Sequence, residues 1–584
     1  MESIPSNPIL DRLPAHLKQY IIPQNYSEYT SINQAVWRYV MRKNITFLSK
    51  VAHHTYVDGL KKTGVSIEEI PDMYGMNRIL KDIGWAAAAV DGFIPPSAFM
   101  EFQAYNVLVI AVDIRTLENI EYTHAPDIIH EAAGHAPIIA NPEYAEYLRR
   151  LGEIGSKAIS SKHDWEVYHA VRKLSQLKEV EEPDMEAIKA AQEEVDRLQA
   201  LRVPPSEMSK IRNLQWWTVE YGLIGTTEKY KIYGAGLLSS IGESEWCLKP
   251  EVKKIPYTID AADQEFDITR PQPQLFVTPN FSHLSKVLEE FANKLSLRKG
   301  GLAGLKKLVE SESLGTIELS TGLQVSGVFT NYEEYEGQVA LIKTMGPTAL
   351  AYREKELIGH STLHYTEGFI SPIGKLKSIN LAIEDMSPVD LEAYGIYEGK
   401  VVSLEYEGGI VVKGRVITGT RNLQGKILLI TLENGNLTLN GKQLYTFQDD
   451  IFHMAIGKKI ISAFAGPADH QSFSLLDHQL SPSTKSKNKS SVVRLKEEAY
   501  QSVRDFRQNG SVKSDLIDDY LQEYDSEWLL LLEILELLLM NKDATRVILT
   551  KEKLQSLSIR KPSIKHLIQS GIEMVEMKKE HPAH

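Results

Sequence analysis

Cysteine is almost absent from this chain, which carries only Cys247 among its 584 residues. A single thiol excludes an internal disulfide and any metal site built from several cysteines, and it fits a reducing compartment. An excess of positive charge is also lacking, because the formal net charge is −12. Such a surface repels nucleic-acid phosphates and anionic lipids. We therefore expect neither a nucleic-acid partner nor a membrane partner.

Long apolar runs are missing as well. The densest, from Trp528 to Met540, has 13 residues and contains Glu533 and Glu536, so it is too short and too charged to cross a bilayer. The N-terminus, MESIPSNPILDRLPAHLKQ, has charge and proline where a signal peptide needs an apolar stretch. These absences predict a cytoplasmic protein. The run around Trp528 is expected to form a core or oligomerisation helix, which leaves a homo-oligomer open.

The length of the chain exceeds what one hydrophobic core supports and predicts two to four domains. Shifts in composition and periodicity suggest, in order, an N-terminal extension, a mainly α-helical catalytic domain, a β-rich domain of unknown role, a polar linker and a helical C-terminal region: 1–30, 31–300, 301–480, 481–491 and 492–584. We expect the β-rich domain to be a folded module for stability or assembly.

Helical spacing of apolar residues predicts helices from Ile32 to Leu60, from Tyr74 to Ala88 and from Ala98 to about Val112. Residues 163–200 are rich in Glu, Lys, Gln and Ala. They predict an antiparallel helical pair that turns at Pro183 and is inserted between two halves of a site.

The pattern changes in the second half of the chain. Val401 to Ile417 and Ile427 to Leu439 have the character of strands, with turn signals at Gly408-Gly409 and Asn434-Gly435.

Two histidines stand in the segment PDIIHEAAGHAP, residues 126–137. It resembles the zinc-protease pattern HExxH, but His130 and His135 are five residues apart instead of four and diverge by about 140° on an ideal helix. A helix capped by Asp127 and ended by Gly134 in a left-handed conformation would let His135 swing back toward His130. Alone, the pair is equally well explained as two ordinary helix-end histidines.

A third candidate ligand, a carboxylate, favours a metal site over two ordinary histidines. Glu220 lies in the apolar and aromatic segment WWTVEYGL, residues 216–223, where a buried charge requires a partner such as a cation. Two histidines and one carboxylate are the ligand set of oxygen-activating non-haem iron(II) enzymes. The sequence therefore predicts an iron site formed by His130, His135 and Glu220.

Three ordered blocks of the chain resemble the pterin-dependent aromatic amino acid hydroxylases. They are PDIIHEAAGHAPIIANPEYAEYLRRLGEIG, TVEYGL and YGAGLLSSIGE, and the likeness extends from near Trp37 to near residue 300. The resemblance implies that family's mainly α-helical catalytic fold. It also implies Fe(II), tetrahydrobiopterin or a related tetrahydropterin, O2, and an aromatic amino acid as the substrate. Conversion of L-phenylalanine to L-tyrosine is the expected reaction.

The resemblance also implies roles for individual residues. Arg115 would bind the substrate carboxylate through two hydrogen bonds from its planar guanidinium group. Other positions would support that carboxylate, line the ring pocket or influence substrate choice: Thr123, Ser239, Pro126, Trp216, Tyr221 and Ile268. A second set would bind the pterin through stacking, backbone amides or a nearby carboxylate: Gly92, Phe93, Ile94, Phe99 and Glu131. Gln215 departs from the family, where tyrosine is frequent at this position, and puts the detailed pterin pose in doubt.

Other functions remain open from the sequence. A tyrosine or tryptophan hydroxylase of the same family would use the same chemistry, although Trp216 and the apolar Ile268 favour phenylalanine by analogy. A metallohydrolase could use His130, Glu131 and Glu220, but the histidine spacing argues against it. A non-catalytic scaffold whose function lies in the C-terminal half is a third alternative.

Overall fold

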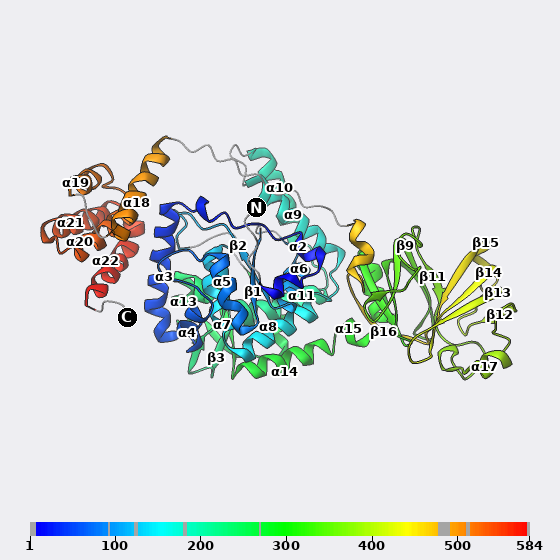
Figure 1. Ribbon diagram of the computed structural model, residues 1–584. Helices are drawn as coiled ribbons and strands as arrows, with labels where there is room; N and C mark the ends of the chain where they lie inside the picture. Colours follow the sequence, from blue (N-terminus) through cyan, green and yellow to red (C-terminus); the bar gives the residue numbers. More distant parts are fainter. Residues whose placement is uncertain are drawn as a thin grey trace.

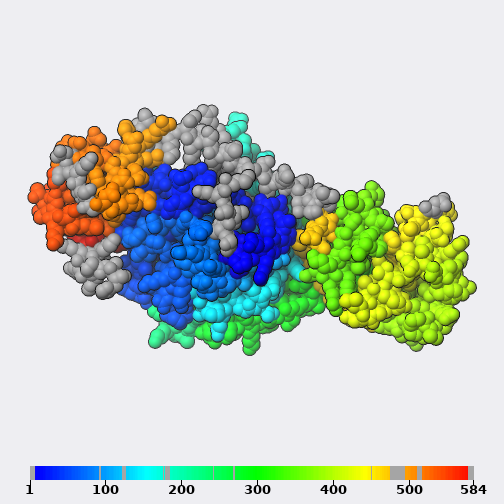
Figure 2. Space-filling view, viewed as in Figure 1, coloured from blue at the N-terminus to red at the C-terminus, as the bar shows by residue number. Residues whose placement is uncertain are grey.

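The computed structural model of the chain describes residues 7–90, 94–121, 126–178, 184–267, 270–476, 491–509 and 514–580. A mainly α-helical part occupies the middle of the molecule, β-sheets project from one end, and a group of C-terminal helices lies at the other (Figure 1). The space-filling view shows the same order, with the C-terminal helices lying against the N-terminal third of the chain (Figure 2).

The predicted helices between Ile32 and Leu60 are confirmed as α3 (Ser31–Val51) and α4 (Thr55–Lys62). Thr30 and Asn33 form a capping box at the start of α3, in which each side chain accepts a hydrogen bond from the other residue's backbone N–H. Val36, Trp37 and Val40 of α3 are fully buried. This long helix is therefore a central support of the helical part.

The helices predicted to reach Ala88 and Val112 end earlier, so both predictions are wrong in their second halves. Helix α5 (Met73–Leu80) is followed by a left-handed Gly84, and α6 (Pro96–Ala104) by Asn106 at φ 58°. Each leads into a strand, β1 (Ala86–Val90) or β2 (Val107–Ala111), and the two pair in parallel. Both strands are buried along their whole length, so tertiary pairing overrides the helical preference of alanine.

Two short N-terminal helices cover this small sheet. They are α1 (Pro8–Asp11) and α2 (Ala15–Lys18), and Leu10, Leu13 and Leu17 pack in one cluster with residues of both strands and of α6. Residues 9–20 are thus attached to the helical part by apolar contacts.

The remaining elements of the helical part surround the candidate site. They are η3 (Ile129–His135), α7 (Ala136–Ile139), α8 (Pro142–Gly155), α11 (Glu207–Gln215), η4 (Trp216–Glu220), α12 (Ala235–Ser239), α13 (Ile241–Trp246), η5 (Ile259–Asp263), α14 (Phe281–Ala292) and α15 (Ser296–Lys299). A four-stranded sheet of order β4-β3-β6-β5 completes this part, with strands Tyr230–Ile232, Leu223–Gly225, Gln274–Thr278 and Lys253–Pro256 in that order.

The predicted helical pair between residues 163 and 200 is present as α9 (Lys162–Lys178) and α10 (Met185–Gln199). The Asp184 side chain caps α10 by accepting hydrogen bonds from two backbone N–H groups. A small apolar cluster of Leu174, Ala191 and Val195 joins the two helices. Pro183, where the turn was expected, lies outside the described residues.

Beyond α16 (Gly301–Ser311) the chain forms two antiparallel sheets. The first has the order β10 (Lys355–Glu356), β9 (Gln338–Tyr352), β8 (Leu323–Tyr335), β7 (Leu314–Leu319) and β16 (Ile460–Ala465). A further strand, β11 (Ile370–Pro372), pairs with β9. The second has the order β12-β13-β14-β15, with strands Val401–Glu405, Ile410–Arg421, Ile427–Leu439 and Lys442–Ala455. Helix α17 (Pro388–Ala393) precedes the second sheet, and η7 (His470–Leu476) follows the last strand of the first.

The strands predicted at 401–417 and 427–439 are confirmed, and Gly409 turns the chain between β12 and β13 with φ 74°. The turn predicted at Asn434-Gly435 is wrong, because these residues form a register shift inside β14. Asn434 has φ 50°, and a Cβ on Gly435 would lie 1.8 Å from the Lys413 carbonyl oxygen. A β-bulge uses the same residue types as a hairpin turn, which explains the error.

The C-terminal part is helical, as predicted, with α18 (Ser491–Asn509), α19 (Ser514–Glu523), α20 (Trp528–Met540), α21 (Ala544–Arg560) and α22 (Lys565–Glu580). Helix α20 is the apolar run, and it is buried by its neighbours as a core helix. Among the described residues, no helix combines the length and the apolar character needed to cross a membrane.

The two carboxylates inside this apolar run are held by arginines. Glu533 accepts from Arg38 at 3.1 Å and from Arg507 at 2.8 Å, and Glu536 accepts from Arg42 at 2.8 Å and from Arg507 at 2.7 Å. Two of these arginines belong to α3 and the third to α18. Buried charges need such pairing, so this network joins the C-terminal helices to the helical part.

Candidate iron centre and substrate pocket

Two π-helical segments carry the three predicted metal ligands. η3 contains His130 and His135, and η4 ends at Glu220. In a π-helix the backbone hydrogen bond joins residues five apart, so residues with that spacing return to one face. The two imidazole rings accordingly lie 4.9 Å apart between centroids, edge to face. The five-residue spacing that rules out the protease geometry equals the hydrogen-bond spacing of a π-helix.

This geometry corrects the predicted role of Gly134. The helix does not end there in a left-handed conformation, because η3 runs through it into α7. A Cβ on Gly134 would instead lie 2.6 Å from the carbonyl oxygen of Ala235. Glycine is therefore required for the close approach of η3 to α12. The predicted cap is confirmed, since Asp127 Oδ1 accepts from the backbone N–H of His130 at 3.1 Å.

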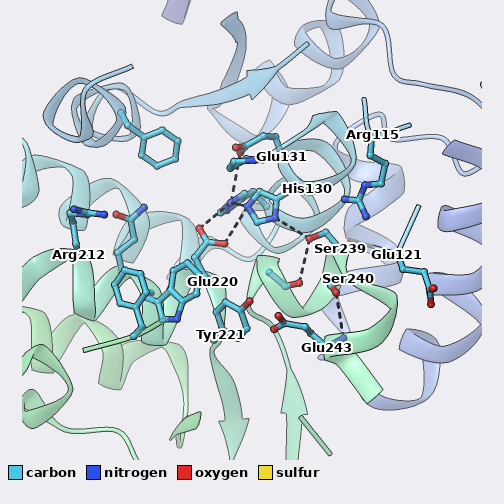
Figure 3. A pocket seen from close by; sticks show the side chains of 17 residues that line it. Arg115, Glu121, His130, Glu131, Arg212, Glu220, Tyr221, Ser239, Ser240 and Glu243 are labelled. Atoms are coloured by element: carbon cyan, nitrogen blue, oxygen red, sulfur yellow. Dashed lines mark hydrogen bonds and ion pairs between the residues drawn. The ribbon is translucent and has the colours of Figure 1, made fainter. Parts of the chain in front are cut away.

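The three ligand side chains converge on one point, where Figure 3 labels His130 and Glu220. His130 Nε2 and His135 Nε2 are 3.2 Å apart, and each lies 3.3 Å from an oxygen of Glu220. Donor atoms in neighbouring positions of an octahedral ion, bound at about 2.1 Å, lie about 3 Å apart. The three donors thus have the spacing of one face of an octahedron.

Residues outside the triad fix the orientation of His130. Its Nδ1 lies 3.0 Å from Ser239 Oγ, which donates to the Ala235 carbonyl oxygen at 2.8 Å. Ser239 Oγ therefore accepts a hydrogen bond from Nδ1–H of His130, and Nε2 keeps its lone pair for a cation. This contact differs from the carboxylate support that the family resemblance implied for Ser239.

The electrostatics of the triad favour a cation at its centre. Burial by itself would lower the pKa of His130, but the Glu220 carboxylate outweighs it and raises this pKa to about 9. Burial would raise the pKa of Glu220, but His135 and His130 outweigh it and hold the pKa below its ordinary range. Without a metal, a proton on His130 would balance the charge of Glu220. A divalent ion would take the place of that proton.

A hollow of about 370 Å³ opens over the triad. It is lined by all three ligands and by several predicted substrate or pterin residues: Arg115, Pro126, Trp216, Tyr221, Ser239, Phe99 and Glu131. Burial raises the pKa of Glu131. Figure 3 shows Arg115 and Arg212 on opposite sides of the triad. The pocket therefore has a cationic side chain on each side of the metal position.

Arg115 is held rigidly at the pocket wall. Its Nε and Nη2 donate to the two oxygens of Asp127 at 2.8 and 2.9 Å, and its backbone N–H donates to the same carboxylate at 3.0 Å. Burial would raise the pKa of Asp127, but Arg115 outweighs it and keeps the carboxyl ionised. The bidentate pair uses one edge of the guanidinium, and Nη1 on the other side donates to the Ile120 carbonyl oxygen at 3.5 Å. Each of Nη1 and Nη2 carries a second N–H that can serve another acceptor.

Aromatic rings form a second wall of the pocket. Trp216 stacks on Phe266, with ring centroids 4.2 Å apart and planes 9° from parallel, and on Tyr221 at 4.6 Å and 28°. Their flat faces present a surface suited to another aromatic ring.

Some predicted site residues are not brought to the pocket. Ile94 packs with Phe99 in the apolar cluster under β1 and β2 and does not line the hollow. Thr123, Ile268, Gly92 and Phe93 lie outside the described residues.

Sequence reasoning missed several contributors to this site. Phe266 and Arg212 line the pocket, and Asp127 holds Arg115. The only available signal for Phe266 was its position two residues before Ile268. Asp127 was recognised as a helix cap, but its contact with Arg115, twelve residues earlier, has no signature in the sequence.

Two histidines and one carboxylate on one face of an octahedron define a non-haem iron oxygenase site. Comparison with known proteins is consistent with this class. Residues 16–171 and 188–299 match the model of the family described as biopterin-dependent aromatic amino acid hydroxylase. This part of the chain is therefore similar to that family.

Individual relatives cover the same part of the chain. Phenylalanine-4-hydroxylase of Pseudomonas aeruginosa is 28% identical over 278 residues, which are 47% of this chain and 89% of the relative. The enzyme of that name from Mesorhizobium japonicum is 26% identical over 269 residues, 45% of this chain and 81% of the relative. A crystal structure of Chromobacterium violaceum phenylalanine hydroxylase with bound iron(III) and 7,8-dihydrobiopterin is 24% identical, with a TM-score of 0.37, covering 48% of this chain and 89% of the other.

Proposed function

We propose that this chain is a monooxygenase that converts L-phenylalanine to L-tyrosine, with O2, a tetrahydropterin and Fe(II). The observation that carries the proposal is the triad of His130, His135 and Glu220, with 3.2–3.3 Å between donor atoms, at the base of a pocket with an aromatic wall. The relatives named phenylalanine-4-hydroxylase support phenylalanine as the substrate, in preference to tyrosine or tryptophan.

The triad is the proposed binding site for the iron. Its donor set, burial and spacing fit a divalent first-row ion, and the Ser239 contact presents His130 Nε2 toward it. When bound, iron(II) together with the tetrahydropterin would supply the activation of O2. The protein contributes placement and the exclusion of water, so that hydroxylation takes place at the carbon of the bound ring that is nearest the metal.

Arg115 is the proposed anchor of the amino acid. Its guanidinium is fixed by Asp127 and by the Ile120 carbonyl oxygen, and the second N–H groups of Nη1 and Nη2 can hold the α-carboxylate of the substrate. The ring would then lie along the wall formed by Trp216, Tyr221 and Pro126. Thr123 and Ile268 remain proposed substrate residues.

The pterin is proposed to bind on the other side of the metal position. Phe99 would stack on the pterin ring, and Glu131, buried beside the triad, would lie near it. Gly92, Phe93 and Ile94 remain proposed members of this site. Arg212 and Gln215 line the same hollow and are candidates for contacts with the pterin edge.

We also propose that catalysis is confined to residues 31–300, including the helical insertion at 163–200. The extension 1–30, the β-rich region 301–480, the linker 481–491 and the helical region 492–584 would then serve stability or assembly. The buried ion pairs between α3 and α20 support a stabilising role for the C-terminal helices.

A product assay tests the proposed function. Purified protein loaded with Fe(II) is supplied with a tetrahydropterin, O2 and an equimolar mixture of phenylalanine carrying an isotope label in its ring, unlabelled tyrosine and unlabelled tryptophan. We expect labelled tyrosine as the main product, consumed pterin in proportion, and no product when the pterin is left out. Hydroxylated tryptophan or dihydroxyphenylalanine as the main product would identify a sister activity of the family, and no pterin-dependent product at all would refute the proposal.

A further inference from the structure

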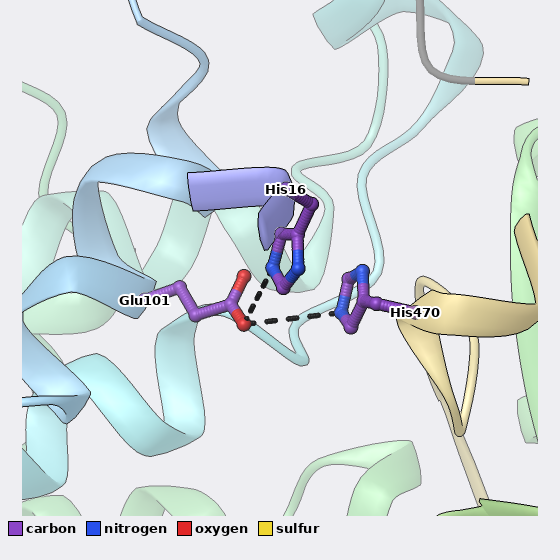
Figure 4. Close-up of side chains that lie close together, drawn as sticks. All are labelled: His16, Glu101 and His470. Carbon is purple, nitrogen blue, oxygen red and sulfur yellow. Dashed lines mark hydrogen bonds and ion pairs between the residues drawn. The ribbon is translucent and has the colours of Figure 1, made fainter. Parts of the chain in front are cut away.

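A second cluster of metal-binding side chains lies away from the iron triad (Figure 4). It consists of His16 on α2, Glu101 on α6 and His470 at the start of η7. His16 Nε2 lies 2.9 Å and His470 Nε2 lies 3.8 Å from the same oxygen of Glu101. Three segments widely separated in the sequence thus direct two imidazoles and one carboxylate to a single point.

The cluster has the composition and spacing of a tetrahedral metal site. Donor atoms bound to zinc at about 2.0–2.1 Å lie about 3.3–3.4 Å apart, and the two observed nitrogen–oxygen distances of 2.9 and 3.8 Å bracket this value. The three ligand atoms all lie within 4.8 Å of one another. The imidazoles stack with centroids 3.6 Å apart and planes 7° from parallel. To bind one ion, the two rings would turn out of this stack so that their lone pairs converge.

The surroundings leave space for a fourth ligand and do not oppose a cation. A hollow of about 360 Å³ borders all three residues, so water can occupy the remaining position. Lys157 also lines this hollow, but its ammonium group is paired with Glu354 at 2.5 Å. The side chains of His16, Glu101 and His470 are 12%, 17% and 40% exposed, so the cluster is partly buried and remains open to the hollow on the His470 side.

We propose that His16, Glu101 and His470 form a second metal site, which binds a divalent first-row cation such as Zn²⁺ and is independent of the iron triad. With three protein ligands from α2, α6 and η7, the ion would fasten the N-terminal segment and the turn that follows the first β-sheet onto one helix. That helix also carries Phe99, which lines the substrate pocket. The β-rich region would therefore be attached to the catalytic part through the metal.

Metal counting on the full-length chain tests this site. Metal-free protein is titrated with Zn²⁺ by calorimetry, and tightly bound zinc is then counted after desalting. We expect two equivalents for the wild type, one for His470→Phe, one for His130→Ala, and none for the double variant. Phenylalanine replaces His470 so that the stacked ring is kept while the ligand is lost. Because His130→Ala removes only the iron triad, the two sites are counted separately, whatever reaction the triad supports.

Two further variants test whether a lost equivalent reflects misfolding or non-specific zinc binding. Glu101→Gln keeps the shape of the side chain and should also lose one equivalent, with an unchanged circular dichroism spectrum. His163 pairs with Glu166 at 4.0 Å but has no second histidine, so His163→Ala should keep both equivalents. Two equivalents in His470→Phe or in Glu101→Gln, or a single equivalent in the wild type, would overturn the proposal.

Discussion

Gly134→Ala tests whether the close packing of η3 on α12 positions the iron ligands. The added Cβ would lie 2.6 Å from the Ala235 carbonyl oxygen, while an ordinary contact begins at 3.4 Å, so one side must move by 3.4 − 2.6, about 0.8 Å. Overpacking of this kind costs about 1–3 kcal/mol. The better helix propensity of alanine offsets up to about 1 kcal/mol of that cost.

The displacement would reach the metal ligand through two hydrogen bonds. The Ala235 carbonyl accepts from Ser239, and Ser239 accepts from His130. Disturbing a residue that orients a metal ligand typically weakens metal binding by about 10–100-fold. We therefore expect the Kd of Gly134→Ala for Fe(II) to rise by about that factor, and phenylalanine hydroxylation at limiting iron to fall with it.

Anaerobic calorimetric titration with Fe(II) measures the effect, alongside thermal unfolding of the metal-free protein. Gly75→Ala is the matched control, because Gly75 lies in α5 and its Cβ would meet no atom within 4 Å. This variant should bind iron like the wild type and be slightly more stable, by about 0.4–1 kcal/mol. If Gly134→Ala bound iron as tightly as Gly75→Ala and unfolded at the same temperature, the packing argument would be refuted.

Three other predictions concern residues that hold the ligands and the fold. Ser239→Ala should weaken Fe(II) binding about 10–100-fold without unfolding the protein, because His130 loses its orienting partner; equal affinity in a titration would contradict this. Asp127→Asn should raise KM for phenylalanine about tenfold or more by loosening Arg115, with kcat less affected. Folding lowers the pKa of Asp127 from 3.8, so the ionised carboxylate stabilises the folded protein at any pH above 3.8. This stabilisation is lost as the pH falls below 3.8 and through the lowered pKa, so the difference in stability between the wild type and Asp127→Asn should shrink there. Glu533→Ala should lower stability by about 3–5 kcal/mol, measured by urea unfolding, because buried arginines lose their partner.

The ligands could be predicted from the sequence because their residue types and neighbours are specific. His130, His135 and Glu220 stand in segments with a recognisable pattern, and the structure brings all three together. The π-helix was not predicted, because α- and π-helical turns have the same residue preferences and differ only in the hydrogen-bond partner. The role of Gly134 was missed for a related reason, since its constraint comes from Ala235, about a hundred residues later.

Errors in the fold arose where tertiary contacts decide the structure. The alanines of β1 have a strong helical preference, yet pairing with Val107–Ala111 makes them a buried strand. The charges within α20 argued only against a membrane span, because two of their three arginine partners lie almost 500 residues earlier: the Arg38–Glu533 pair is separated by 495 positions. Sequence periodicity contains no information about such distant pairs.

The iron content of Glu220→Ala tests the central claim most directly. Wild-type protein and the variant, each in the His470→Phe background so that only the triad is counted, are loaded anaerobically with Fe(II), desalted and measured for bound iron by atomic absorption. The wild type is expected to retain about one equivalent at the triad, and Glu220→Ala close to none, because the carboxylate that balances the cation and completes the octahedral face is gone. Retention of the same iron by Glu220→Ala, with full hydroxylation of phenylalanine, would contradict the assignment of this site.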